Sequence, residues 1–304
     1  MGPSLKTHPL ENEAPMSQST DLIDRRTARE KVRVDPAHAR SWQLVNALWA
    51  EQYDAAQLGR ADAVIIDIED AVDDSKKDLA RGYVLDWLSG GGTAWVRIND
   101  VSTDAWATDV GALAGVPGLA GVVLAKTESA ADVADTFRAL GGAIPVTALV
   151  ESALGVEQAV SIACADGTFR LAFGGGDYRK DTGAENTPLA MAYPRSRLVV
   201  ASRIGGLTGP IDTPTVSSTH GVIREQCADG VSMGMTGKLC LDGDQPGVIN
   251  ESMSPTSADV AWAVGFVESF EANGRVIRDG SDKPRLARAE MIMRRAEYFR
   301  IALG

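Results

Sequence analysis

Residues 63–72 read Ala-Val-Ile-Ile-Asp-Ile-Glu-Asp-Ala-Val, and this stretch decides the fold. Its apolar first half is typical of a strand that is buried on both faces, as in a parallel sheet. Asp67, Glu69 and Asp70 follow directly, and unpaired carboxylates are strongly disfavoured inside an apolar core. We therefore expect them where the strand meets solvent, a cation or a ligand, which in parallel α/β proteins is the carboxyl edge of the sheet. Taken alone, the stretch fits a helix cap with solvated acids equally well.

The same pattern recurs along the chain, because strand candidates alternate with helix candidates and glycine-rich turns. The strand candidates are residues 41–46, 63–69, 94–99, 121–126, 146–151, 170–177, 210–216 and 238–242. Such alternation predicts a parallel sheet, and eight units over about 210 residues are typical of an α/β fold with a (β/α)8 TIM barrel. An open doubly wound sheet is the alternative, although no G-x-G-x-x-G motif follows the first strand.

Composition divides the chain into three parts. Residues 1–30 are polar and without periodicity, which predicts a disordered tail. Residues 31–250 hold the strand–helix units of the catalytic barrel. Residues 251–304 contain two further helix candidates, 257–272 and 284–303. We expect this extension to form a lid over a barrel mouth or a contact with another subunit, and a simple cap at one barrel end is the alternative.

Charge and composition narrow the classes of partner. The chain has 304 residues with 30 basic and 41 acidic side chains, giving a net charge of −11, which disfavours nucleic acid and anionic membrane surfaces. There is no apolar run of membrane-spanning length and no signal-peptide pattern at the N-terminus, so we expect a cytoplasmic protein. Three cysteines without a C-x-x-C pair and three scattered histidines supply a zinc site or a Ser-His-Asp triad poorly. The chemistry should therefore rest on carboxylates, arginine and lysine.

Almost every strand candidate ends in a polar or charged side chain. These endings are Asn46, Glu69 with Asp70, Arg97 with Asn99, Lys126, Glu151, Asp177, Asp212 and Asp242. In a barrel the carboxyl ends of all strands meet at one rim, where this fold builds its sites. The sequence therefore predicts a functional site at that rim.

The residue types at the rim indicate enolate chemistry. Glu151 and Asp177 could together bind one hard cation, Mg²⁺ or, as the alternative, Mn²⁺. Arg97 offers a planar fork for a substrate carboxylate or a developing enolate oxygen, or it pairs with neighbouring acids. Lys126 could be a Schiff-base nucleophile, but surrounding carboxylates should keep its pKa high, which favours ion pairing or anion binding. A metal and an arginine that polarise a keto acid, with a base to move a proton, suit the cleavage or formation of a C–C bond.

These residues resemble the citrate lyase β-subunit group of the HpcH/HpaI aldolase superfamily. The matching pieces are Arg40-Ser41, residues 61–72, Lys76 and Lys77 with Ala80-Arg81, residues 96–99, Ala125-Lys126, residues 148–155, residues 173–177 and Gly237-Lys238. The resemblance implies a barrel that is usually trimeric or a multiple of that, so we expect a homo-oligomer, a trimer or hexamer. It implies Mg²⁺ bound by Glu151 and Asp177, and an Arg97 that contacts the keto-acid or acyl carbonyl.

The resemblance also implies roles for the other acids. Glu69 and Asp70 would surround the metal waters and Arg97, and Asp282 in the stretch Asp282-Lys283-Pro284 resembles a lid aspartate that acts as acid or base from a neighbouring subunit. We expect Arg40 and Lys126 to join Arg97 and Glu151 in binding the substrate. Relatives of this kind cleave or condense 3-hydroxyacyl-CoA thioesters such as malyl-, citramalyl- or citryl-CoA.

The chain departs from the family pattern at three places. Gly174-Gly-Gly-Asp177 stands where Gly-x-Glu-Asp is usual, residues 237–243 lack the usual Ile-His-Pro, and Val45-Asn46 replaces Val-Pro. The leading hypothesis is a Mg²⁺-dependent carbon–carbon lyase acting on an acyl-CoA. A CoA-independent keto-acid aldolase, an acyl-CoA thioesterase and a non-catalytic binding homologue are the alternatives. The acyl group, the direction, the pathway and any partner subunits are not specified by the sequence.

Overall fold

Eight parallel strands close into a barrel in chain order in the computed structural model, which describes residues 15–302. They are β1 Ser41–Asn46, β2 Ala63–Asp67, β3 Ala94–Ile98, β4 Leu119–Leu124, β5 Val146–Val150, β6 Thr168–Phe173, β7 Ile211–Asp212 and β8 Gly237–Cys240. The last strand pairs with the first, with Ser41 opposite Lys238. The prediction of a (β/α)8 TIM barrel is confirmed.

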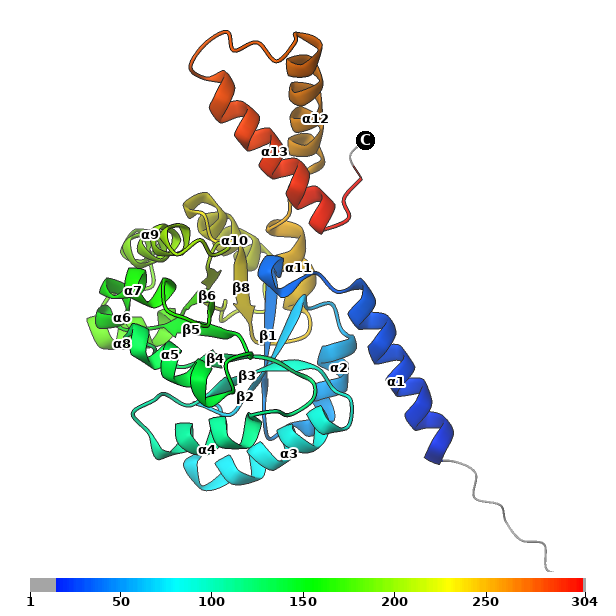
Figure 1. The fold of residues 1–304 in the computed structure, drawn as a ribbon, viewed down its shortest axis with the longest axis vertical. Helices are drawn as coiled ribbons and strands as arrows, with labels where there is room; N and C mark the ends of the chain where they lie inside the picture. Colours follow the sequence, from blue (N-terminus) through cyan, green and yellow to red (C-terminus); the bar gives the residue numbers. More distant parts are fainter. Residues whose placement is uncertain (1–14, 303–304) are drawn as a thin grey trace, which may run out of the picture. The chain divides into compact units, whose positions relative to one another are not determined.

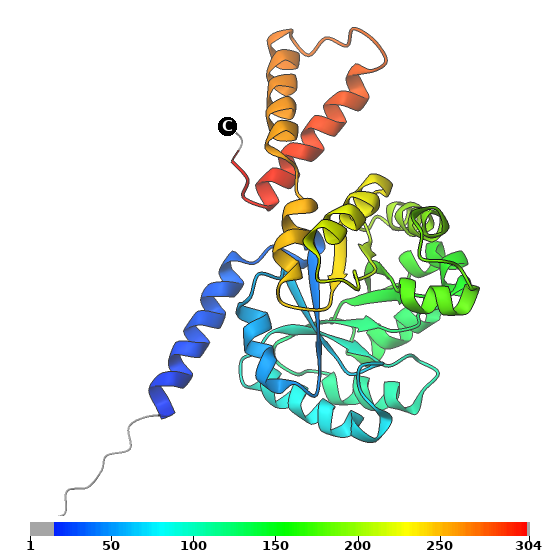
Figure 2. The same cartoon turned by 180° about the vertical axis from the view of Figure 1, so that it is seen from behind.

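Helices surround this barrel, as both views of the ribbon show (Figure 1, Figure 2). They are α2 Tyr53–Leu58, α3 Lys77–Ser89, α4 Asp104–Leu113, α5 Ala130–Ala139, α6 Ala153–Glu157, α7 Ala159–Ala163, α8 Gly175–Thr182, α9 Pro188–Ile204, α10 His220–Met233 and α11 Gln245–Ser252. Short 3-10 helices occupy Pro36–His38, Ala50–Gln52 and Asp74–Lys76. The stretch after β5 forms two short helices, α6 and α7. No helix in the described residues is long and apolar enough to cross a membrane.

The alternation of side chains along each strand separates two apolar layers. Val64 and Ile66 of β2 belong to the core between the strands and the helices, whereas Ile65 belongs to the core inside the barrel. The inward set also contains Trp42, Trp95, Val123, Leu149, Ala172, Ile211 and Leu239. This alternation decides which residues beyond the strand ends face the barrel axis.

Helix α1, Pro15–Val32, belongs to a separate compact unit that ends at Arg33. This corrects the expectation of a disordered tail over residues 15–30; residues 1–14 of that tail lie outside the described residues. The helix is polar and carries a surface ion pair between Arg25 and Asp21, 3.9 Å apart. A helix without an apolar stripe has no hydrophobic period, so a search for such periods does not detect it.

Helices α12, Ser257–Ala272, and α13, Asp282–Tyr298, form a hairpin that projects from the barrel (Figure 1). The hairpin has an apolar core of its own, which includes Val260 and Ile292. The Tyr298 ring stacks on His38 with centroids 3.8 Å apart, and His38 comes just before β1. The base of the hairpin therefore lies at the amino ends of the strands. It does not lid the mouth of its own barrel, and a lid role would have to act on another subunit.

Candidate active site at the carboxyl ends of the strands

The inward layer of the barrel continues into polar side chains at the carboxyl rim. Asp67, Arg97, Glu151 and Thr213 each come two residues after an inward-facing apolar residue of their strand, so the two-residue period aims them at the barrel axis. A cavity of about 230 Å³ opens here. It is lined by Leu44, Arg97, Leu149, Glu151, residues 174–177, Arg179, Asn186, Arg195, Thr213, Pro214, Val216, Gln226 and Leu239. The predicted rim site thus coincides with a real cavity.

Arg97 is fixed in this cavity by carboxylates on the neighbouring strand. Its Nε donates to Asp67 Oδ1 at 2.7 Å and its Nη2 to Asp67 Oδ2 at 2.6 Å. Its Nη1 lies 3.3 Å from Glu69 Oε2. Although burial opposes the charged form, Asp67 and Glu69 raise the pKa of Arg97, so the guanidinium stays protonated. The expected alternative partner, Asp70, is not among these contacts.

Lys126 completes a second ion-pair cluster with Glu69 and Asp70. Its Nζ lies 2.5 Å from Glu69 Oε1 and 3.1 Å from Asp70 Oδ1. Burial would lower the pKa of Lys126, but the two carboxylates outweigh it and raise the pKa. A protonated amine is no nucleophile, so the structure favours the ion-pair role over a Schiff base. The backbone of Lys126 is left-handed, with φ 48°, and this turn directs the side chain toward Glu69.

Glu151 is the most perturbed acid of the rim. Its side chain is buried, and Oε1 accepts the Lys126 backbone N–H at 2.8 Å. A Cβ on Gly174 would lie 2.2 Å from Glu151 Oε2, so only glycine lets the next strand end pass this carboxylate. Burial raises the pKa of Glu151 to about 8, with the Lys126 N–H and Arg97 opposing the rise. The ionised form therefore lacks a counter-charge that a bound cation would supply.

Asp177 reaches the same cavity from a helix and not from a strand end. Strand β6 ends at Phe173, and α8 begins at Gly175, which corrects the expected strand over 170–177. The Gly174 N–H still donates to Val150 O at 2.9 Å, and the Gly175 N–H donates to Thr213 Oγ1 at 3.1 Å. The glycine run turns the chain tightly enough to place Asp177 in the first turn of α8 beside Glu151.

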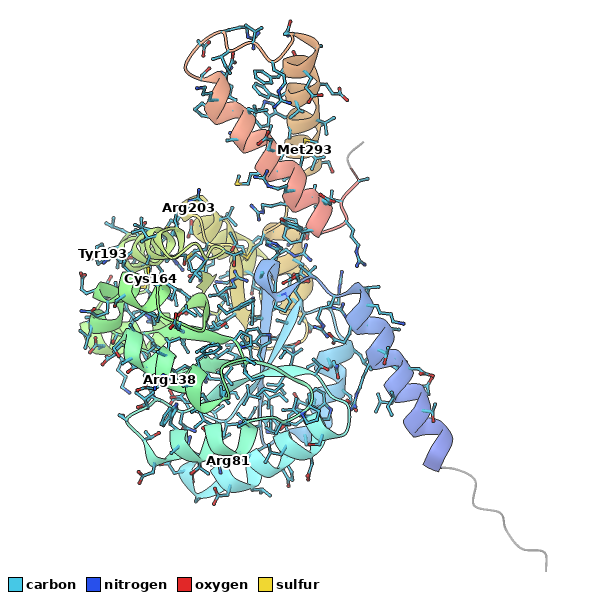
Figure 3. All side chains as sticks on the ribbon, viewed as in Figure 1. Arg81, Arg138, Cys164, Tyr193, Arg203 and Met293 are labelled. Carbon is cyan, nitrogen blue, oxygen red and sulfur yellow. The ribbon has the colours of Figure 1, made fainter. Side chains whose placement is uncertain are left out.

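A polar network behind the rim holds the segment that carries Glu69 and Asp70. Lys77 Nζ donates to the carbonyls of Ile68 and Glu69, each at 3.1 Å, and to Asn99 Oδ1 at 2.7 Å. Asn99 donates to the buried Asp109 at 2.7 Å, and Arg81 of α3, labelled in Figure 3, also binds Asp109. Asn99 was expected at the rim as a site residue, but its amide is engaged in this support.

Several predicted rim residues are engaged elsewhere. Asn46 donates to Ala71 O at 2.6 Å, and Asp242 accepts the Asp244 N–H at 2.9 Å in the turn before α11. Asp212 is one residue out of phase with the inward Ile211, so it points outward and pairs with Arg195 at 2.8 Å and Lys238 at 3.5 Å.

Arg40 and Asp282 do not join the cavity in this chain. Arg40 precedes β1 and so lies at the amino end of the barrel, where its Nε is 2.7 Å from Asp62 Oδ2. A guanidinium held there cannot contact a substrate at the carboxyl rim of the same barrel. Asp282 begins α13 and accepts the Arg278 backbone N–H at 2.9 Å. Its predicted lid role requires a neighbouring subunit.

Reasoning from strand ends alone gave no role to three side chains of the site. Asp67 was expected at the carboxyl edge; it ends β2 and shares the phase of Ile65, and this phase was the signal that could have assigned it to Arg97. Arg195 and Thr213 line the cavity from α9 and from the segment after β7. Nothing in the local sequence distinguishes Arg195 from the other arginines of α9.

The donor set fits a hard cation that completes its shell with water and ligand oxygens. No group of three His, Cys, Asp or Glu side chains within residues 15–302 is arranged to hold a metal alone. Glu151 and Asp177 face one cavity, and the first is a buried carboxylate whose ionised form is disfavoured. Mg²⁺ commonly uses one or two carboxylates and keeps several waters, so two acids and an open cavity suffice.

Two family models match this chain in succession. Residues 44–243 match the HpcH/HpaI aldolase/citrate lyase model, and residues 258–300 match the HpcH/HpaI aldolase C-terminal domain. The chain belongs to the HpcH/HpaI aldolase/citrate lyase family. It is 29% identical over 252 residues to a citrate lyase subunit beta-like protein of Deinococcus radiodurans, covering 76% of this chain and 88% of the relative. The resemblance stated from the sequence is thereby confirmed, and the chain is a lyase-type enzyme.

Other members of the family differ in what they do. The chain is 30% identical to a (3S)-malyl-CoA thioesterase of Cereibacter sphaeroides, over 69% of this chain and 75% of the relative. The solved structure of CitE from Mycobacterium tuberculosis in complex with magnesium, acetoacetate and coenzyme A has a TM-score of 0.73 and 27% identity. That match covers 86% of this chain and 99% of the solved one.

Proposed function

We propose that this protein is a Mg²⁺-dependent carbon–carbon lyase that cleaves or condenses a 3-hydroxyacyl-CoA thioester of the malyl, citramalyl or citryl type. The observation that carries the proposal is that Arg97, Glu151 and Asp177 line one cavity at the carboxyl rim. A human citramalyl-CoA lyase is 28% identical over 69% of this chain and 69% of its own length. CitE from Mycobacterium tuberculosis was solved with magnesium and coenzyme A.

In the cleavage direction, a base removes the proton of the 3-hydroxyl group while the bond between the second and third acyl carbons breaks. The electron pair of that bond passes to the thioester as an enolate, which takes up a proton to give the shorter acyl-CoA. The hydroxyl carbon becomes the carbonyl carbon of the released keto acid. When bound between Glu151 and Asp177, Mg²⁺ would supply a Lewis acid for the keto-acid oxygens.

The residues of the chain have separate parts in this reaction. Asp67 accepts hydrogen bonds from Nε and Nη2 of Arg97. The guanidinium is thereby fixed in place and can donate to a developing oxyanion without reorienting. Lys126 neutralises Glu69 and Asp70, which keeps these acids from repelling an anionic substrate. Asp282 of a neighbouring subunit is our proposed acid or base, and a homotrimer or hexamer would bring it there.

The first experiment incubates the protein with malyl-, citramalyl- and citryl-CoA, with and without Mg²⁺. Keto acid is measured as its phenylhydrazone and free thiol with a disulfide reagent. A lyase gives Mg²⁺-dependent keto acid and no thiol. Thiol without keto acid would instead establish a thioesterase, the activity of one relative. Neither product from any of the three substrates would refute both activities.

The oligomer is tested separately. Light scattering after gel filtration should give three or six times the 32.1 kDa chain. A monomer with full lyase activity would contradict a lid that acts in trans, because α13 contacts the amino end of its own barrel.

A further inference from the structure

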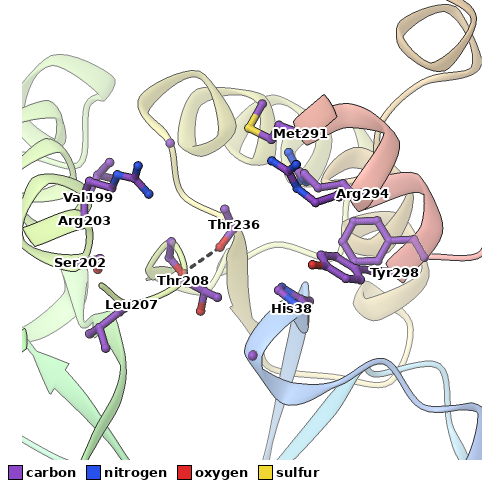
Figure 4. A pocket seen from close by; sticks show the side chains of 15 residues that line it. His38, Val199, Ser202, Arg203, Leu207, Thr208, Thr236, Met291, Arg294 and Tyr298 are labelled. Carbon is purple, nitrogen blue, oxygen red and sulfur yellow. Dashed lines mark hydrogen bonds between the residues drawn. The ribbon is translucent and has the colours of Figure 1, made fainter. Parts of the chain in front are cut away.

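We propose that a second cavity, at the amino ends of the strands, binds a small amphipathic organic anion. The cavity has a volume of about 420 Å³, within the range of small-molecule sites. It lies between α9, the segments that precede β7 and β8, and α13 (Figure 4). Since Arg97 and Glu151 lie at the carboxyl rim, this site is separate from the proposed active site.

Three arginines line this cavity. They are Arg203 of α9 (labelled in Figure 3) and Arg294 and Arg295 of α13, and none of the described lining residues is acidic. His38 also lines it, but burial lowers the pKa of its imidazole, which therefore adds no fixed charge. Arg295 donates to Met253 O at 2.6 Å, whereas Arg203 and Arg294 are exposed. Asp35 acts on His38 and Asp259 on Arg295, and Glu290 and Glu297 lie one turn from Arg294 on α13. None of these acids lines the cavity, so its mouth favours an anion.

A buried arginine beneath the cavity adds to this positive charge. Arg170 is fully buried, and its Nη2 donates to Gly209 O at 2.7 Å and to Thr236 Oγ1 at 3.0 Å. Both Gly209 and Thr236 line the cavity. Its other hydrogen bonds among the described residues also go to backbone carbonyls. No carboxylate within residues 15–302 pairs with the guanidinium, so its positive charge adds to the potential in the cavity.

The interior of the cavity supplies both polar and apolar contacts. Ser202 Oγ and Thr208 Oγ1 are buried and have no hydrogen-bond partner within residues 15–302, and both residues line the cavity. Buried hydroxyls are normally satisfied, so either side chain is free to turn toward an oxygen of a ligand in the cavity. The remaining wall is apolar or aromatic and consists of Val199, Leu207, Met291, Phe299 and the stacked Tyr298. A carboxylate or sulfonate with an aromatic or aliphatic body matches this division.

The test uses 8-anilinonaphthalene-1-sulfonate, an aromatic body with one sulfonate, on the full chain. We expect one saturable, fluorescence-enhancing site per chain that octanoate displaces and that Mg²⁺ with pyruvate does not. The double variant Arg203→Gln/Arg294→Gln should weaken binding by about tenfold, because two partly exposed cations are lost. Arg285→Gln removes one positive charge from the exposed face of α13 outside the cavity, so it is the control for a charge effect that does not depend on the cavity.

A filling variant gives a second, charge-independent test. Leu207→Trp should abolish probe binding by occupying the cavity, while circular dichroism and gel filtration report that the fold is kept. Absence of a saturable site in the parent chain would overturn the proposal. So would displacement by Mg²⁺ with pyruvate, equal weakening by Arg285→Gln, or unchanged affinity in the double variant. If Leu207→Trp does not fold, the arginine variants still decide the question.

Discussion

Each end of the barrel interior holds an arginine, fully buried at the amino end and partly buried at the carboxyl rim, and the two are held in opposite ways. At the carboxyl rim, Arg97 is clamped by the carboxylates of Asp67 and Glu69, which raise the pKa of its guanidinium. At the amino end, Arg170 donates to backbone carbonyls and one hydroxyl, and burial lowers the pKa of its guanidinium to about 9.

The side chains around the two arginines differ in net charge, which is negative at the carboxyl rim and positive at the amino end. The carboxylates of Asp67, Glu69, Asp70, Glu151 and Asp177 gather at the rim around Arg97 and Lys126. A rim with more acids than bases favours a bound cation, whereas the amino end has an unneutralised cation and favours an anion. The same barrel can therefore bind ligands of opposite charge at its two ends.

Replacement of Arg97 by lysine should have the largest effect on the rim. A lysine cannot reproduce the two-edged contact with Asp67 and still reach a substrate oxygen, so kcat should fall by about 10²–10³-fold. Steady-state kinetics on the reactive CoA thioester measure this. Arg138→Lys, on the exposed side of α5, is the control and should leave kcat unchanged. A kcat within twofold of the parent in Arg97→Lys would exclude Arg97 as the oxyanion contact.

Replacement of Glu151 by glutamine should remove Mg²⁺ binding and stabilise the metal-free fold. The pKa of Glu151 is raised to about 8, so between roughly pH 4.5 and 8 the unfolded chain releases a proton that the folded chain keeps. The stability of the metal-free parent should thus fall as the pH rises through this window, and Glu151→Gln should recover about 4 kcal/mol at pH 8.

Urea unfolding at pH 5 and pH 8, with isothermal titration of Mg²⁺, tests this pair of effects. The exposed Glu185→Gln is the matched control. Retained Mg²⁺ affinity in Glu151→Gln would remove Glu151 from the metal site, and an unchanged pH dependence would show that its burial is not destabilising.

Replacement of Arg170 by methionine should affect stability and not turnover. The methionine fills similar space but removes the hydrogen bonds of the guanidinium to the carbonyls of Ala39 and Gly209, which among the described residues keep only the Trp42 Nε1 and Thr236 Oγ1 donors. This loss should lower the free energy of unfolding by about 2 kcal/mol. The value of kcat should stay that of the parent, because the residue lies at the end opposite to Arg97. Urea unfolding and steady-state kinetics measure both quantities. A loss of turnover at unchanged stability would contradict this division between the two ends.

Replacement of Lys77 by methionine should give the smallest effect, through Glu69. Loss of the contacts to Ile68 O and Glu69 O should lower kcat by about tenfold, as is usual for groups that orient site residues. Lys77→Arg should keep part of the rate. Lys76 is exposed, so Lys76→Met should leave kcat unchanged. A fall in melting temperature without a change in kcat would make Lys77 a structural residue only.

The sequence predicted the barrel because its signal is distributed and repeated. Each strand, such as Ala63–Asp67, combines an apolar run with a polar ending, and eight repetitions outweigh errors at single boundaries. The prediction of strand over residues 170–177 was wrong because a glycine run carries no period. The conformation of this glycine run depends on how closely Glu151 approaches Gly174. This is a tertiary contact, which the local sequence does not show.

The site was predicted where a side chain follows the inward phase of its strand. Arg97 and Glu151 do so, and both line the cavity. Asp212 has the opposite phase and was not distinguished from them, because its partner Arg195 comes from a helix. Arg40 was placed at the substrate from resemblance to a motif, although its position before β1 already assigns it to the amino end.

Backbone strain and ion pairing favour different residues at position 126, where the backbone of Lys126 is left-handed. At φ 48° a glycine would relieve about 1 kcal/mol of backbone strain, so selection for stability alone favours glycine there. Only a long cation, however, reaches both Glu69 and Asp70. Engineering for thermal stability would thus tend to replace Lys126, and each such gain would leave Asp70 without its ion pair and Glu69 with Arg97 alone. Position 126 is therefore where a more robust variant of this protein would most readily lose its chemistry.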